Sequence, residues 1–86
     1  MTYLSHIRGD AMDEDRWNDV AKGLLRAELK RRDLTYGDLA ERLKPLGVEE
    51  TANAIAKKVN RGTFSAAFLL ASLMAIGCPV VRLDDA

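Results

Sequence analysis

Apolar residues recur three or four positions apart in the first half of the chain. The set consists of Trp17, Val20, Ala21, Leu24, Leu25 and Leu29. This spacing places one apolar stripe on a helix, so we predict an amphipathic helix over about Arg16–Arg32. The carboxylates of Asp13–Asp15 are suited to its N-cap. Residues 1–12 show no periodicity and are predicted to form a tail.

Two shorter helices are predicted after the first. Thr35, followed by Asp38, resembles a capping box and predicts a helix over Tyr36–Lys44, which Pro45-Leu46-Gly47 ends. A third helix is expected to begin among Glu49–Thr51 and to run to Asn60, with Gly62 as its C′ residue. Its apolar residues, expected to face the core, are Ala52, Ile55, Ala56 and Val59.

A nearly continuous apolar stretch, Phe64–Ile76, predicts a fourth helix, with Thr63 or Ser65 as its cap and Gly77 as its C′ residue. A helix that is apolar all round must be buried on more than one side. Val80–Leu83 is a candidate for a short extended segment. The core is expected to contain Leu39, Leu43, Ile55, Val59, Phe68, Leu69 and Leu73, together with Trp17, Val20 and Leu24.

These elements predict an all-α protein, a compact four- to five-helix bundle. Its parts are an N-terminal tail over 1–12, a helical domain over 13–77 and a short extended C-terminal segment over 78–86. A chain of 86 residues allows one domain. It has no apolar stretch long enough to span a bilayer and no signal peptide pattern, so we expect a soluble cytoplasmic protein.

Charge is balanced overall, with 13 basic and 13 acidic residues, but it is unevenly distributed. Several acids lie near the two ends, whereas Thr51–Ser65 contains Lys57, Lys58 and Arg61 and no acid. A locally basic face on a neutral protein is a footprint for phosphate contact. With the apolar positions of the third helix turned inward, its exposed set is Thr51, Asn53, Ala54, Lys57, Lys58 and Arg61.

That exposed set contains residue types that pair with base edges, since Asn pairs with adenine and Lys or Arg with guanine. The two short predicted helices, the second of which is basic, indicate a helix-turn-helix unit. In such a unit the first helix holds the second in position to enter the major groove. Lys and Asn are also common on solvated helix faces. The pattern alone therefore leaves open both a DNA-binding helix and an ordinary exposed one.

Three segments resemble the Cro/CI-like, or XRE-type, helix-turn-helix family: Leu25–Leu43, Val59–Phe64 and Leu70–Gly77. The chain resembles still more closely a group of small uncharacterised bacterial proteins that share the Arg-Gly-Thr-Phe-Ser segment, here Arg61–Ser65, and an early tryptophan, Trp17. The resemblance implies a small regulator of transcription that binds double-stranded DNA and associates with the nucleoid. It implies that Tyr36 lies near a phosphate, that Thr51, Asn53, Ala54, Lys57 and Lys58 face the groove, and that Arg61 and Thr63 clamp backbone phosphates.

The chain departs from the family pattern in two places. The turn over Lys44–Glu50 is longer than the usual tight connection, and Glu49 and Glu50 lie near the start of the groove-facing helix. Those carboxylates either repel phosphate or complement the helix N-terminus. A protein-interaction adaptor with the same fold is the alternative function.

The apolar fourth helix and Val80–Leu83 offer more apolar surface than one small bundle covers. This predicts a homodimer, or a monomer in which the N-terminal tail covers that surface. No catalytic residue, metal site or cofactor is expected, because the glycines are isolated and the one histidine, His6, lies in the predicted tail. Because Cys78 is the only cysteine, an intramolecular disulfide is excluded. We expect Cys78 to be a half-buried packing residue.

Overall fold

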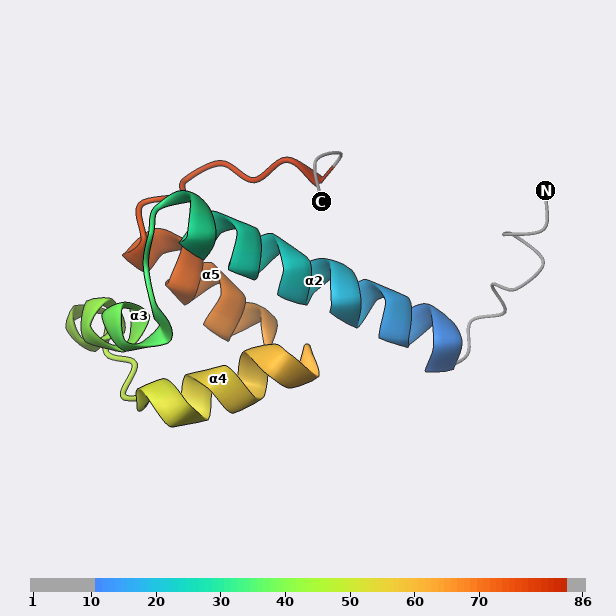
Figure 1. Ribbon diagram of the computed structural model, residues 1–86, viewed down its shortest axis with the longest axis horizontal. Helices are drawn as coiled ribbons and strands as arrows, with labels where there is room; N and C mark the ends of the chain where they lie inside the picture. Colours follow the sequence, from blue (N-terminus) through green and yellow to red (C-terminus); the bar gives the residue numbers. More distant parts are fainter. Residues whose placement is uncertain (1–10, 84–86) are drawn as a thin grey trace.

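A computed structural model describes residues 11–83 of the chain, and the side chains from Glu14 onward. Four α-helices and a short 3-10 helix follow one another: α2 (Ala11–Arg31), α3 (Tyr36–Leu43), η1 (Lys44–Leu46), α4 (Ala52–Arg61) and α5 (Ala66–Ala75). The part described contains no β-strand. Figure 1 shows α4 and α5 along the C-terminal half of α2, whose N-terminal turns extend beyond them, and α3 at the opposite end of the molecule, against α4 and α5. The predicted all-α bundle is confirmed.

The first helix begins earlier than predicted. It starts at Ala11, so Asp13–Asp15 lie inside its first turns and the prediction that they precede the helix as N-cap is wrong. No proline or glycine interrupts Ala11–Lys22, so nothing in this stretch stops the helix from continuing toward the N-terminus. The rest of the predicted tail, including His6, lies outside the described residues.

Local signals place the other helix ends where the sequence predicts them. The Thr35 hydroxyl accepts a hydrogen bond from the Asp38 N–H at 3.1 Å, and the Asp38 carboxylate accepts one from the Thr35 N–H at 2.9 Å. This capping box is confirmed. Gly62 ends α4 in the left-handed region, at φ 72°. Of the two candidate caps for α5, it is Ser65 that accepts from the Phe68 N–H.

The core lies where α2, α3, α4 and α5 meet. Its apolar members are Leu24, Leu25, Leu29, Leu39, Ala40, Leu43, Ile55, Val59, Phe68, Leu73, Ile76 and Cys78. Cys78 is buried rather than half-buried, with 5% of its surface exposed, and Leu69 and Val20 are only partly buried. The prediction that Trp17 belongs to the core is wrong, because its residue is 58% exposed. Trp17 lies in the N-terminal half of α2, and the N-terminal turns of this helix extend beyond the other helices (Figure 1).

The fourth predicted helix is buried on one side only. The α5 side chains that are buried are Phe68, Ser72 and Leu73, whereas Leu70 is 63% and Met74 67% exposed. The expectation of burial on more than one side is therefore wrong for the single chain. Val80–Leu83 forms no strand and is exposed.

Candidate nucleic-acid interface

The connection between α3 and α4 sets the position of α4. The predicted long turn is partly helical, because Lys44–Leu46 forms η1 with Pro45 in its first turn. Gly47 then reverses the chain in the left-handed region, at φ 84°. The Val48 N–H donates to the carbonyl of Leu43 at 3.2 Å, which ties the end of the turn to the end of α3. Ile55 and Val59 fix α4 to the core.

The opposite face of α4 is exposed. The Thr51 hydroxyl caps the helix by accepting from the Ala54 N–H at 3.1 Å. The side chains exposed on this outer face are Asn53, Lys57 and Arg61, and Thr63 is exposed just after the helix. Successive members of this row are four residues apart and therefore neighbours on one helix face. Ala54 is partly buried, and Ala52, predicted to face the core, is exposed.

Lys58 is not part of this outer row, which corrects the prediction that it is exposed beside Lys57. Its Nζ lies 2.5 Å from the Glu50 carboxylate and 4.8 Å from the centre of the Phe68 ring. A step of one residue rotates a side chain by about 100° around a helix, so Lys58 lies against α5 where Lys57 faces solvent. Glu50 is thereby paired within the protein.

Two basic side chains of α2, neither of them among the predicted site residues, lie beside the end of α4. Lys22 donates to the carbonyl of Asn60 at 3.2 Å, and Arg26 donates to the Asn60 side-chain oxygen. Arg26 also donates through Nε to the hydroxyl of Tyr36 at 3.4 Å. The signal available in the sequence was their spacing of four residues, which puts both on one face of the helix.

Tyr36 therefore lies at the meeting point of three helices. It is partly buried against the core, and its hydroxyl, predicted to lie near a phosphate, is beside Arg26 and so next to the α4 end. The hydroxyl keeps its own proton to donate, since it accepts from Arg26. The structure thus brings the start of α3 to the same edge of the molecule as the basic end of α4.

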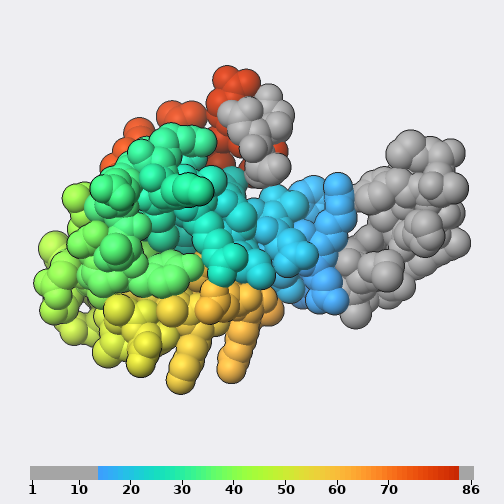
Figure 2. Space-filling view, in the orientation of Figure 1, coloured from blue at the N-terminus to red at the C-terminus, as the bar shows by residue number. Residues whose placement is uncertain are grey.

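Charge around α4 is divided along the helix. Glu41, Glu49 and Glu50 line a shallow groove at its N-terminal end, where Lys44 pairs with Glu41 at 3.1 Å. Lys57 and Arg61, with Arg26 alongside, make the C-terminal end positive, and Lys22 beside them lies 3.9 Å from the Asp19 carboxylate. Figure 2 shows long α4 side chains, in yellow and orange, projecting from this edge of the molecule. The surface is therefore mixed overall and basic at one end.

The capping carboxylate at the start of α3 is held ionised. Hydrogen bonds from the Thr35 backbone and hydroxyl hold the pKa of Asp38 below its ordinary value, and the charge of Arg42 acts in the same direction. A negative group here complements the positive end of the helix. This fixes the start of the helix that braces α4.

These observations define a class of protein, a small all-α domain. In it α4 and α5 pack against the long helix α2, and the short helix α3 packs against α4 and α5. The chain belongs to the family described as a domain of unknown function (DUF6471), whose model matches residues 17–81. Comparisons with curated proteins and with solved structures give no match. Within residues 11–83, no helix is both long enough and apolar enough to cross a membrane.

Proposed function

We propose that this chain is a sequence-specific double-stranded DNA-binding protein, a small regulator of transcription in which α3 and α4 act as a Cro/CI-like helix-turn-helix. The observation that carries the proposal is the outer row of α4, where Asn53, Lys57 and Arg61 are exposed together on a helix held by the core on its other side. An amide and two cations on one projecting helix face are the groups that read base edges and phosphates.

The proposal gives each group a role. Asn53 contacts a base edge in the major groove, with Thr51 and Ala54 beside it, and Lys57 contacts a guanine edge or a phosphate. Arg61, Thr63 and the α2 cations Lys22 and Arg26 contact phosphates at the basic end of α4, and the Tyr36 hydroxyl donates to one more. Lys58 stabilises α4 rather than contacting DNA, because it is paired with Glu50. Such a protein acts in the cytoplasm, bound to the nucleoid.

Charge reversal on the two faces of the bundle tests this assignment. We expect Lys57→Glu to weaken binding to a fluorescent duplex of about three helical turns by tenfold or more, and to reduce the salt slope by about one unit. Arg31→Glu makes the same charge change on the α2 face beside the C-terminal segment, away from α4, and is the control. Equal losses for both variants, or a wild type without salt-dependent binding, would contradict the proposal.

The proposal includes a homodimer through α5. Ala67, Leu70 and Met74 follow one another at helical spacing along its exposed side, and α5 contains no charged residue. An uncharged apolar stripe is self-complementary, as a two-fold interface requires. Two copies would then present their α4 helices to half-sites about 34 Å apart. Sedimentation should give a dimer at micromolar concentration for the wild type and a monomer for Leu70→Glu. A monomeric wild type would contradict the dimer.

The same exposed stripe favours the second candidate function, a protein-interaction adaptor. Large exposed apolar patches mark sites of contact with other proteins as well as sites of self-association. The adaptor takes the place of the DNA-binding proposal if the wild type binds no duplex and Leu70→Glu abolishes a heterologous interaction while leaving the mass of the free protein unchanged.

A further inference from the structure

A cleft separates α2 from the segment that follows α5. Residues 78–82 run alongside the helix (Figure 1), and about 370 Å³ of open space lies between them. This volume falls within the range of small-molecule binding sites, roughly 300–1,000 Å³. The apolar part of the lining consists of Leu24, Ala27, Pro79, Val80 and Val81. The cleft can therefore bury the hydrocarbon part of a ligand away from water.

A glycine in the middle of α2, Gly23, is part of the lining of this cleft. Gly23 lies inside the helix, where glycine is less favourable than alanine, and its φ is not in the left-handed region that would require glycine. A Cβ atom built on it would meet nothing within 4 Å, so packing does not require glycine here either. What the missing side chain provides is room in the cleft.

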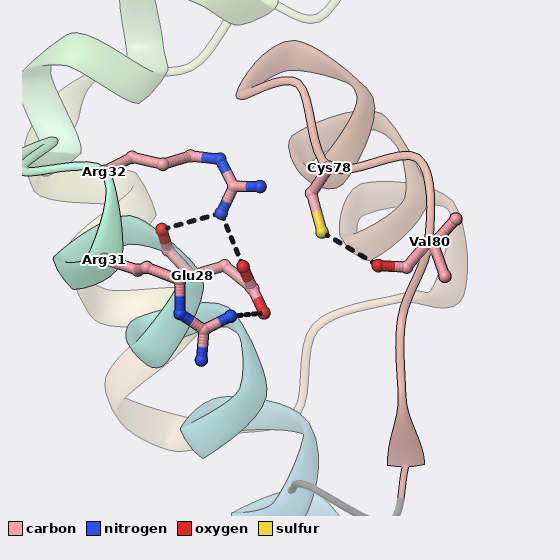
Figure 3. A network of polar contacts seen from close by, with 5 residues as sticks. All are labelled: Glu28, Arg31, Arg32, Cys78 and Val80. Atoms are coloured by element: carbon pink, nitrogen blue, oxygen red, sulfur yellow. Dashed lines mark hydrogen bonds and ion pairs between the residues drawn. The ribbon is translucent and has the colours of Figure 1, made fainter.

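Arginine side chains form the polar part of the lining. Glu28 bridges two of them, with its carboxylate oxygens 2.7 Å from Arg31 and 2.5 Å from Arg32 (Figure 3). The pKa of Glu28 is lowered, chiefly by the hydrogen bond from Arg32, so the Glu28 carboxylate is ionised and forms ion pairs with both arginines. Arg82 lines the same cleft from the other side. Arg31 and Arg32 together carry one more charge than Glu28 neutralises, so the α2 side of the cleft is positively charged.

We propose that this cleft binds a small amphipathic anion, a compact hydrocarbon body that bears one carboxylate or phosphate group. The hydrocarbon lies along Leu24, Ala27 and Val80 and enters the space beside Gly23. The anionic group lies at Arg31, whose side chain is 64% exposed and whose planar guanidinium has further N–H donors beyond the one bonded to Glu28. This site lies on a different side of α2 from Lys22 and Arg26, so it does not depend on the proposed DNA contact.

Calorimetric titration of the full chain with four probes tests the chemistry. Hexanoate and hexyl phosphate each contain both parts of the ligand, whereas hexanol and inorganic phosphate each contain one. We expect at least one amphipathic anion to bind about tenfold more tightly than both single-part probes. Tighter binding of hexanoate assigns a carboxylate ligand, and tighter binding of hexyl phosphate assigns a phosphate ester. Binding of hexanol or inorganic phosphate as tight as that of the anions, or no binding, would overturn the proposal.

Two variants and a control test the location. Gly23→Leu should fill the cleft and abolish binding, while its melting temperature stays equal to or above that of the wild type, because leucine is the better helix former and meets open space. Arg31→Gln should weaken binding about tenfold. Lys30→Gln, the neighbouring position outside the cleft lining, should leave it unchanged. Unchanged affinity in Gly23→Leu, or amide shifts in the complex centred away from residues 23–32 and 78–82, would overturn the proposal.

Discussion

At Gly62 the absence of a side chain determines how closely α4 approaches α2. A Cβ atom there would lie 2.8 Å from the backbone oxygen of Asn18, and the residue has a φ of 72°. We expect Gly62→Ala to destabilise the fold by about 2–4 kcal/mol, from left-handed strain and displacement of α2 together. Gly47→Ala is the matched control, since φ is 84° there and a Cβ would meet nothing within 4 Å. Its loss should be about 1 kcal/mol. Equal losses in urea unfolding would contradict this account.

Lys57 and Lys58 are adjacent lysines with different roles. Lys58→Met removes the pair with Glu50 and leaves that partly buried carboxylate without its cation, so we expect a loss of roughly 1 kcal/mol. Lys57→Met changes an exposed side chain and should alter stability by less than about 0.5 kcal/mol. Thermal unfolding of the two variants compares them directly. Equal stability would show that the contact with Glu50 contributes nothing.

Asp38 makes stability depend on pH. Its pKa in the folded protein is lowered by the Thr35 hydrogen bonds, so its contribution is complete above the ordinary value of 3.8. The contribution is lost as the pH falls from there through the lower folded pKa, because the carboxyl is then protonated in both states. We expect Asp38→Asn to lose less stability than the wild type between about pH 6 and about pH 3. Parallel losses in urea unfolding would contradict this.

At the scale of residues, the sequence predicts contacts well where both partners lie within a few positions of each other along the chain. The Thr35–Asp38 capping box and the C′ role of Gly62 depend on backbone groups within a few positions, and both were predicted. Lys58 was not separated from Lys57, because its partners, Glu50 and the Phe68 ring, lie on other elements. The contact of Tyr36 with Arg26 was missed for the same reason.

At the scale of elements, α5 shows that a uniformly apolar sequence does not define a buried face. Phe68 is buried and Leu70 is 63% exposed, although both are large apolar residues on the same helix. We expect Phe68→Ala to cost about 3–5 kcal/mol, because it leaves a cavity in the core. Leu70→Ala should cost much less in urea unfolding of the monomer, at dilute protein concentration. Comparable costs would show that the assigned faces of α5 are wrong.

The two element-scale errors have one physical cause. Periodicity identifies which side of a helix is apolar, but it does not show how far the neighbouring helices extend. Trp17 belongs to the predicted apolar stripe of α2 and is next to Asn18, where Gly62 approaches the helix, yet Trp17 is 58% exposed. Likewise, one side of α5 has no neighbour among the described helices. The helices themselves were predicted because each combines a periodic stripe with end signals.

At the scale of the whole molecule, the bundle presents different chemistry on different sides. The basic end of α4 and the start of α3 meet at Arg26, the apolar stripe of α5 lies on a separate helix, and the arginine-lined cleft lies between α2 and residues 78–82. The sequence indicated the first two surfaces through residue type. The cleft was not predictable, because it depends on where the C-terminal segment lies against α2.

The central claim is that the outer face of α4 contacts duplex DNA, and amide chemical-shift mapping by NMR tests it most directly. On titration with a duplex of about three helical turns at low salt, we predict that the largest shifts fall on α4 and on the start of α3. Amides around Asn53, Lys57, Arg61 and Tyr36 should change most, while those of α5 and residues 78–82 change least. The shifts should reverse as salt is added. An unchanged spectrum, or shifts centred on α5, would contradict the account.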